Sequence, residues 1–262
     1  MTNSAKPTAL LVLKDGTVIE GIGLGATGQA VGEVCFNTAI TGYQEILTDP
    51  SYAGQIVTMT TPLQGNYGTS DGDLESTHAH CAGFVVRELA NLESNYRSTA
   101  KLEAWLEAQG LTGIAGIDTR ALTRKLRVDG AMDGVLCTDP DKSDEELVQM
   151  ARDSAGLVGR NLAKEASRRE PVAWDEDLGE WSPLQGVIAP PSKRYKVVAI
   201  DCGAKLNILR NLVDSGCDVT VLPWDATPEQ IREHKPDGLF VSNGPGDPAA
   251  VSETIATLKE VM

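Results

Sequence analysis

The 262-residue sequence predicts an α/β protein in which a strand-rich part precedes a parallel-sheet part, and three observations indicate this. Residues 196–241 contain three short apolar runs separated by helix-length segments, an alternation typical of parallel strands joined by crossover helices. Residues 9–137 instead contain many short strand-like runs bounded by turn residues. Residues 168–192 lie between these parts, hold four prolines and show neither helical nor alternating periodicity.

This pattern predicts two domains and a linker. We expect the first domain over residues 1–155, the linker over residues 156–195 and the second domain over residues 196–262. Trp174 and Trp181 lie inside the predicted linker. Two such large apolar side chains indicate that the linker packs against a domain.

The charge of the chain restricts its partners. A formal net charge of −14 argues against nucleic acid or an anionic membrane as partner, because phosphates attract basic surfaces. One local basic cluster stands out from this average, and we expect it to be a solvated helix face: Arg120, Arg124, Lys125 and Arg127.

Cysteine usage and apolar run length together predict a cytoplasmic protein. The five cysteines are odd in number and include no C-x-x-C pair, as is typical of reduced thiols buried as small hydrophobic groups. No apolar run approaches the roughly 18 residues of a membrane span, and residues 1–7 lack the apolar core of a signal peptide.

The first domain opens with a predicted hairpin. Its strands cover residues 9–13 and 17–22, around an Asp15-Gly16 turn. The glycines of residues 21–28 superficially match a dinucleotide-binding motif, but that motif requires a following helix and residues 31–36 have the pattern of a strand. Turns and bulges of a small sheet explain these glycines better.

Residues 41–52 are polar, rich in hydroxyl groups and poor in periodicity. Loops of this composition either connect strands or present side chains to a ligand, and the residues alone favour a connector. His78 and His80 have no further ligand-type residue at metal-binding spacing. We therefore expect two surface histidines and no metal site.

The remaining elements of the first domain are marked by caps and apolar runs. Strands are predicted over residues 81–87 and 132–137. Helices are predicted after three N-terminal signals: Ser98 or Thr99, then Asp118, then a capping box formed by Ser143 and Glu146.

The second domain reads as βαβαβ. Its loops 201–205, 223–227 and 242–248 follow the carboxyl ends of predicted parallel strands, where α/β proteins bind ligands. In the last loop Gly244 and Gly246 let the backbone approach a ligand and turn its N–H groups toward it, as an oxyanion, carboxylate or phosphate requires. A tight turn without a ligand explains the same residues equally well.

Cys202 also follows a strand and is a candidate nucleophile. A reactive thiol needs an electropositive setting and a base. The only histidine of this half, His234, follows a helix and is expected at the opposite end of the sheet. We therefore expect Cys202 to be an ordinary buried thiol.

Five motifs together resemble the small, glutamine-hydrolysing subunit of carbamoyl-phosphate synthase. They occur in the family's order over nearly the whole chain: EVCFNT at 33–38, TGYQEILTDPSY at 41–52, IDTR at 117–120, GAKLNI at 203–208 and SNGPGDP at 242–248. The second motif is highly specific, whereas the last is shared by many class I glutamine amidotransferases. The resemblance implies an N-terminal swivelling β/β/α domain followed by an incomplete class I glutaminase domain with a flavodoxin-like parallel sheet.

The resemblance also implies an activity. In this family a Cys-His-Glu triad hydrolyses L-glutamine, and the ammonia passes to a large synthetase subunit. That subunit, a ligase, makes carbamoyl phosphate from bicarbonate and ATP for arginine and pyrimidine biosynthesis. ATP, Mg²⁺ and bicarbonate are therefore expected on the large subunit, with no cofactor or metal in this chain.

The matching positions imply a glutamine site. Gly244 would donate its N–H to the oxyanion, Gly246 would help to hold the glutamine, and Ser51 would reach the ligand from the first domain. The family's nucleophile lies in a Gly-x-Cys-Leu-Gly-x-Gln motif, with its histidine and glutamate further on. None of these precedes Met262, and Cys202 does not align with the nucleophile.

We therefore expect a chain truncated before the catalytic cysteine and inactive alone. Residues 196–262 form too small a piece to be stable alone, so we expect them to pack on the first domain and linker or to pair with another chain. Two alternatives remain: a non-catalytic regulatory or binding subunit, and a phosphate- or nucleotide-binding α/β module.

Overall fold

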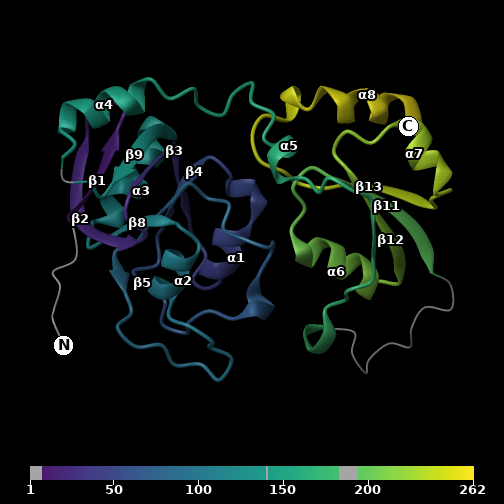
Figure 1. The fold of residues 1–262 in the computed structure, drawn as a ribbon, viewed down its shortest axis with the longest axis horizontal. Coiled ribbons are helices and arrows are strands. Elements are labelled where there is room, and N and C mark those ends of the chain that lie inside the picture. Colours follow the sequence, from purple (N-terminus) through teal and green to yellow (C-terminus); the bar gives the residue numbers. More distant parts are fainter. Residues whose placement is uncertain (1–7, 140, 183–193) are drawn as a thin grey trace. The chain divides into compact units, whose positions relative to one another are not determined.

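The computed structural model describes residues 8–139, 141–182 and 194–262. The chain divides into two compact units, Met1–Leu157 and Val158–Met262, which we call the N-terminal and C-terminal units. The structure is mixed α/β, with a β-rich N-terminal unit and a parallel-sheet C-terminal unit, which confirms the predicted fold class (Figure 1).

The N-terminal unit is built on a closed seven-stranded barrel in the order β1-β2-β8-β6-β4-β3-β9. The pairs β3–β4, β4–β6 and β6–β8 are parallel, and the other pairs are antiparallel. The bounds of these strands are β1 (Thr8–Leu13), β2 (Val18–Gly25), β3 (Gln29–Asn37), β4 (Gln55–Met59), β6 (Gly83–Val85), β8 (Thr112–Ala115) and β9 (Met132–Cys137).

Other elements of this unit surround the barrel. A parallel pair is formed by β5 (Leu63–Gln64) and β7 (Glu88–Leu89). The helices are α1 (Tyr43–Thr48), α2 (Leu102–Ala108), α3 (Thr119–Asp129) and α4 (Asp144–Arg152), with 3-10 turns η1 (Pro50–Tyr52) and η2 (Asp71–Asp73). The glycines after β2 lead directly into β3, so the prediction that they belong to turns of a sheet is confirmed.

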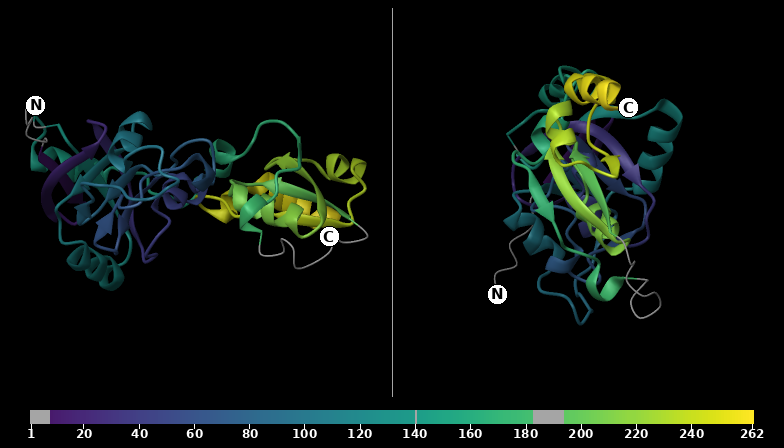
Figure 2. Two further views of the ribbon diagram at one scale, coloured as in Figure 1. Left: turned by 90° about the horizontal axis from the view of Figure 1, so that it is seen from below. Right: turned by 90° about the vertical axis from the view of Figure 1, so that its right-hand side faces the viewer.

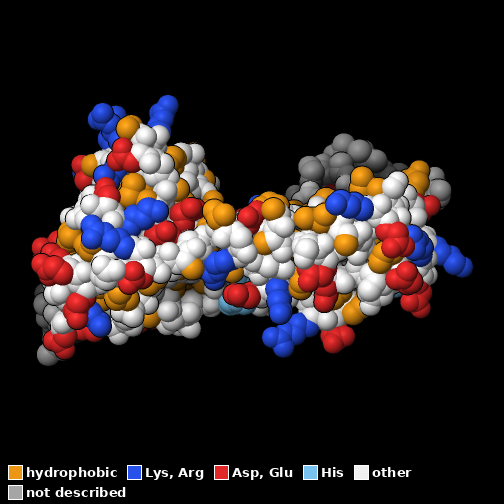
Figure 3. Space-filling model, turned by 90° about the horizontal axis from the view of Figure 1, so that it is seen from above, with side chains coloured by type: hydrophobic (Ala, Val, Ile, Leu, Met, Phe, Trp, Pro, Cys, Tyr) orange, Lys and Arg blue, Asp and Glu red, His pale blue; other side chains and the backbone are white. Residues whose placement is uncertain are grey.

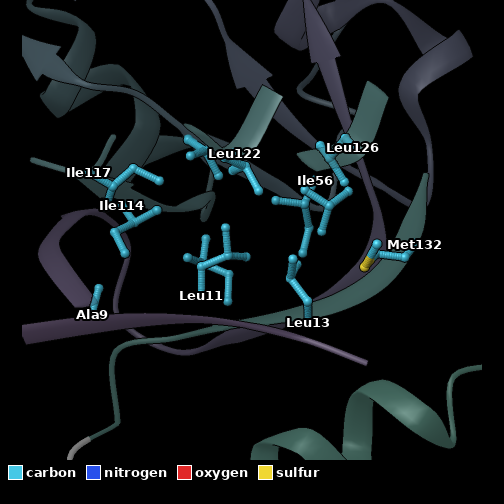
Figure 4. Packing of buried hydrophobic residues seen from close by; sticks show 12 residues of the cluster. Ala9, Leu11, Leu13, Ile56, Ile114, Ile117, Leu122, Leu126 and Met132 are labelled. Atoms are coloured by element: carbon cyan, nitrogen blue, oxygen red, sulfur yellow. The ribbon is translucent and has the colours of Figure 1, made fainter. Parts of the chain in front are cut away.

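The main core of the N-terminal unit fills the barrel and the space beneath α3. Figure 4 shows Leu11, Leu13 and Ile56 of the strands pointing toward Leu122 and Leu126 of α3. All five side chains are buried. Burying an apolar side chain of this size contributes about 1.5–3 kcal/mol, so this cluster is what holds α3 on the barrel.

Two predictions for the helices are confirmed and one is wrong. The Asp118 carboxylate accepts a hydrogen bond from the Ala121 N–H at the start of α3. Ser143 and Glu146 form both bonds of the predicted capping box. The N-cap of α2 is Lys101, not Ser98 or Thr99, and its side chain makes no capping bond. Ser98 and Thr99 instead hydrogen-bond backbone carbonyls of neighbouring loops.

Residues 41–52 were expected to be an irregular loop, and this expectation is wrong. They contain helix α1, on which Tyr43, Ile46 and Leu47 are buried at helical spacing. The helix is only six residues long, and it also buries the polar Gln44 and Thr48. That mixture hides the 3.6-residue period on which sequence-based assignment depends.

The C-terminal unit contains a four-stranded sheet in the order β10-β12-β11-β13. Strands β11 (Tyr195–Asp201), β12 (Cys217–Pro223) and β13 (Gly238–Val241) are parallel, as predicted. Helix α6 (Leu206–Asp214) covers one face, and α7 (Pro228–Glu233) and α8 (Ser252–Val261) cover the other (Figure 1, Figure 2). Short turns of helix complete the unit: α5 (Ala163–Ala166), η3 (Gly179–Trp181) and η4 (Pro248–Ala250).

Part of the predicted linker belongs to this sheet. Strand β10 (Val172–Trp174) pairs antiparallel with β12, so the expectation of irregular structure is wrong at these residues. Three residues are too few to show alternation in the sequence. Trp174 packs against the core as expected, whereas the Trp181 side chain is 58% exposed. Residues 183–193 of the linker lie outside the described part of the chain.

The basic cluster of α3, predicted to be a solvated helix face, is exposed or paired with acidic side chains. Arg120, Arg124 and Arg127 of α3 are exposed, and the Lys125 ammonium pairs with Asp15 at 2.6 Å and Asp129 at 3.1 Å. On the face shown in Figure 3, basic side chains are interspersed with acidic ones. No helix in the described ranges is both long and apolar enough to span a bilayer.

Candidate glutamine site

The candidate site is the loop of residues 242–248, which we call the glycine loop. It begins where β13 ends, beside the carboxyl end of β11, because Val241 pairs with Ile200 in parallel register. The Ser242 N–H continues this pairing by donating to the Ile200 carbonyl at 3.0 Å. The loop therefore starts from a fixed position on the sheet.

Gly244 lies directly on the turn of residues 201–204 that follows β11. A Cβ atom added at Gly244 would lie 2.1 Å from the Cys202 carbonyl oxygen, which is backbone and has little freedom to move. Gly246 has φ +81°, and a Cβ atom there would lie 2.7 Å from the Arg160 carbonyl oxygen. Both positions require glycine because backbone passes against backbone.

Side-chain hydrogen bonds fix the two ends of the glycine loop. The Ser242 hydroxyl accepts from the Cys202 N–H at 2.9 Å and donates to the Asn243 carbonyl at 2.6 Å. At the other end, the Asp247 carboxylate accepts from the N–H groups of Ala249 and Gly159. These two backbone bonds lower the pKa of Asp247, which therefore stays ionised at neutral pH.

A cavity of 390 Å³ opens beside the glycine loop. Gly244 and Gly246 line it together with apolar groups of β13, η4 and α8, of which the main ones are Val241, Pro248, Val251, Ile255 and Leu258. A pocket of this size, lined by apolar side chains and two glycines, suits a small ligand.

Cys202 also lines this cavity but lacks the setting of a nucleophile. Its side chain is buried, and burial raises the pKa of the thiol, with the nearby Asp201 adding to the effect. The sulfur has a long hydrogen-bond contact with the Thr254 hydroxyl at 4.0 Å. His234 follows α7 and precedes the amino end of β13, at the opposite edge of the sheet. The prediction that this thiol is buried is confirmed, and its lack of reactivity stays a prediction.

Ser51, the third predicted site residue, belongs to the N-terminal unit. It is the middle residue of η1 and is half-buried, and its N–H donates to the Asp49 carboxylate at 2.9 Å. Gly244 and Gly246 belong to the C-terminal unit. The structure thus brings the two glycines together on one loop, and the joint role of Ser51 with them stays a prediction.

His78 is exposed and His80 is half-buried, so the expectation of two surface histidines is wrong for His80. Their rings lie tilted with centroids 4.2 Å apart, and burial together with the neighbouring His78 lowers the pKa of His80 to about 4. Within the described ranges, no three His, Cys, Asp or Glu side chains converge as metal ligands.

Several residues around the site were not predicted from the sequence. Gly159, Arg160 and Arg168 come from the predicted linker, yet they contact the glycine loop or the turn beneath it. The sequence contains only an indirect signal for these contacts. Asp201 ends a strand and Asp247 lies in the glycine loop, and carboxylates in such tight turns require hydrogen-bond donors.

Comparisons with known proteins cover both units. Residues 11–136 match the family model "Carbamoyl-phosphate synthase small chain, CPSase domain", and residues 198–262 match "Glutamine amidotransferase class-I". A carbamoyl phosphate synthase small chain of Ruegeria pomeroyi is 50% identical over 98% of this chain. That of Escherichia coli strain K12 is 46% identical over 97% of this chain.

In both relatives the similarity covers nearly the whole chain and therefore both units. The chain spans 67% of the length of each of these two proteins. The sequence motifs, the order of the two units and these identities all indicate the same family. The chain belongs to the carbamoyl phosphate synthase small chain family.

Proposed function

We propose that this chain binds L-glutamine as part of a glutamine-hydrolysing carbamoyl-phosphate synthase. The ammonia released from glutamine would pass to a large synthetase subunit, which forms carbamoyl phosphate for arginine and pyrimidine biosynthesis. The observation that carries the proposal is the glycine loop, which places Gly244 and Gly246 at the edge of a 390 Å³ cavity at the carboxyl end of a parallel strand.

The glycine loop would supply one part of amide hydrolysis, the stabilisation of the oxyanion. The attack on the glutamine carboxamide creates an oxyanion, and a rigid backbone N–H donor stabilises that charge without reorganising. In the proposed site Gly244 donates to the oxyanion and Gly246 helps to hold the glutamine. Ser51 contributes a hydroxyl from the N-terminal unit. The hydrogen bonds of Ser242 and Asp247 support this proposal, because they hold the backbone at both ends of the glycine loop.

The synthesis of carbamoyl phosphate is assigned to the large subunit in this proposal. ATP, Mg²⁺ and bicarbonate would bind to the large subunit, and this chain would need no cofactor or metal of its own. The proposed setting is the cytoplasm, with the large subunit as protein partner and with neither nucleic acid nor a membrane as ligand. The net charge of −14 supports the last point.

Glutamine hydrolysis by these 262 residues alone is expected to be no faster than in buffer. Cys202 is buried, its pKa is raised, and it does not correspond to the family's nucleophile. Loss of the nucleophile costs several orders of magnitude in rate even where oxyanion donors remain. Ammonia release should therefore be at background and unchanged in Cys202→Ala. Release above background that Cys202→Ala abolishes would contradict this assignment.

Glutamine binding can be tested separately from hydrolysis. Two-dimensional NMR of the chain labelled with ¹⁵N-glycine should show the amide signals of Gly244 and Gly246 moving as glutamine is added, because these N–H groups face the ligand. Glutamate serves as a chemical control and ATP as the competing ligand class. Shifts caused by ATP and not by glutamine would favour a nucleotide-binding module and overturn the proposal.

A further inference from the structure

The Asp201 carboxylate is the most heavily bonded buried charge near the glycine loop. Asp201 is 3% exposed at the carboxyl end of β11. One oxygen accepts from the N–H groups of Gly203 at 2.9 Å and Ala204 at 2.8 Å. The other accepts from the Arg168 N–H at 2.9 Å and lies 3.6 Å from the Arg168 Nε. Such bonds to a buried charge are individually strong.

The turn that Asp201 closes is the surface on which the glycine loop rests. Gly203 within this turn has φ +116°, and the carboxylate holds it in place. The Cys202 N–H donates to the Ser242 hydroxyl, and the Cys202 carbonyl lies against the Cα of Gly244. A displacement of the 201–204 turn would therefore move Gly244 with it.

Arg168 also makes contacts besides those with Asp201. Its guanidinium carbon lies 4.7 Å from the centroid of the Trp174 ring, and Trp174 belongs to the edge strand β10. The neighbouring Ser167 hydroxyl accepts from the Trp224 N–H at 3.1 Å and donates to the Arg168 carbonyl at 3.0 Å. Contacts with β10 and with Trp224 therefore help to hold Arg168 in position beside Asp201.

The segment of residues 159–174, which includes Arg168, also holds the Asp247 end of the glycine loop. The Gly159 N–H donates to the Asp247 carboxylate at 3.0 Å, and the Asp247 N–H donates to the Arg160 carbonyl at 3.2 Å. Gly246 packs against residues 160 and 162. Residues 159–174 therefore touch the loop directly at one end and, through Asp201, support it from beneath at the other.

We propose that Asp201 and Arg168 are positioning residues of the glutamine site. Neither contacts the ligand. Their ion pair and hydrogen bonds fix the 201–204 turn, and the turn fixes the direction of the Gly244 N–H. The proposal rests on the proposed function in that glutamine is taken as the ligand of the loop. The position of the loop in the ligand-free chain can be measured without that assumption.

The test compares Asp201→Asn, Arg168→Ala and Arg168→Lys in the full 262-residue chain. The matched control is Asp218→Asn, which removes an exposed carboxylate of β12 that pairs with Arg194. Three quantities are measured: the Gly244 and Gly246 amide shifts without ligand, the exchange rate of these amides, and the glutamine dissociation constant. Thermal unfolding reports whether each variant is folded.

In Arg168→Ala and Asp201→Asn we expect shifted Gly244 signals, roughly tenfold faster amide exchange and roughly tenfold weaker glutamine binding. Arg168→Lys keeps the cation but loses the planar group over Trp174, so it should recover part of the affinity. Asp218→Asn should match the wild type in all three measurements. Arg168→Ala provides the decisive comparison if Asp201→Asn does not fold.

Two failures are distinguishable. If the wild type binds no glutamine, the proposed function fails, while the ligand-free shifts and exchange rates still decide on positioning. If folded Arg168→Ala shows the same Gly244 signal, exchange rate and affinity as Asp218→Asn, the positioning proposal is overturned. A fall in thermal stability without a change at Gly244 would also overturn it, since that result marks a structural role only.

Discussion

Gly244 and Gly246 show how single residues shape the candidate site. Gly246 needs its positive φ, whereas Gly244 needs the space that a side chain would take from the Cys202 carbonyl. Both requirements come from close contact between backbone segments. Both glycines also line the 390 Å³ cavity, where they leave the backbone without a side chain.

Replacing Gly244 with alanine should destabilise the chain by about 1–3 kcal/mol, because the new Cβ cannot be accommodated against backbone. It should also abolish the glutamine-dependent shift of Gly246. Urea unfolding and NMR titration measure the two effects. The matched control is Gly238→Ala on β13, where the nearest atom would be the Val197 Cγ2 at 3.9 Å. This control should stay within about 0.5 kcal/mol of the wild type. Equal losses in both variants would contradict the argument.

His80 should contribute to acid sensitivity. Its pKa is lowered from 6.5 to about 4 by burial and by His78. The unfolded chain therefore binds a proton between these values that the folded chain does not, so stability is lost as pH falls through this window. His80→Gln should flatten the change in unfolding free energy between pH 7.5, which lies above this window, and about pH 4, its lower end.

The control for this experiment is His234→Gln, which replaces an exposed histidine of the C-terminal unit. It should leave the pH dependence of unfolding close to that of the wild type. A slope that is unchanged in His80→Gln, or flattened equally in both variants, would show that burial of His80 is not the cause.

At the scale of elements, side-chain hydrogen bonds mark the start of three of the described helices, α3, α4 and α7. Helix α3 begins at the Asp118 carboxylate, and both α4 and α7 begin with complete capping boxes. Such local signals can be recognised in the sequence because donor and acceptor lie three residues apart. Helix α1 begins at Gly42, which has no side chain, and its N–H bonds the distant Tyr67 hydroxyl at 2.6 Å.

Removing the α3 cap should have a measurable cost. Asp118→Ala leaves a helix N–H without its side-chain acceptor and should lower the unfolding free energy by about 1 kcal/mol. Urea denaturation followed by circular dichroism measures the change. Lys101→Ala at the N-cap of α2 is the matched control, since the Lys101 side chain makes no capping bond there. Loss of 1 kcal/mol in both variants would point to a general helix effect instead.

At the scale of the whole molecule, the two units differ in how they close their sheets. The barrel of the N-terminal unit has no free edge. In the C-terminal sheet, among the described residues, β13 is a terminal strand, and Val241 on it is 39% exposed. An apolar parallel strand at an edge is a template for pairing with another chain.

We therefore expect the chain to self-associate as its concentration rises. Val241→Lys places a charge on the β13 edge and should shift the equilibrium toward monomer in sedimentation velocity experiments. Val172→Lys on β10, the opposite edge strand with only three residues, should have a smaller effect. A chain that stays monomeric at all concentrations, with either variant indistinguishable from it, would refute this expectation.

Local signals explain which parts of the structure were predictable. The hairpin around Gly16, the caps at Asp118 and Ser143 and the three parallel strands each depend on residues within one element. Helix α1 was missed because its six residues bury polar as well as apolar side chains, and strand β10 was missed because three residues are too few to show alternation. Gly244 and Gly246 could be named from the motif, but the groups that hold them could not.

The sequence by itself determined the α/β class, the order of the units, the family resemblance and the glycine loop as the candidate site. These depend on periodicity and on motifs whose residues are close in the chain. Only the tertiary structure showed that Asp201, Arg168 and Asp247 support the loop. The reason is physical. A hydrogen bond between residues 33 or 88 positions apart leaves no local pattern, because it exists only once the strands have brought its two ends together.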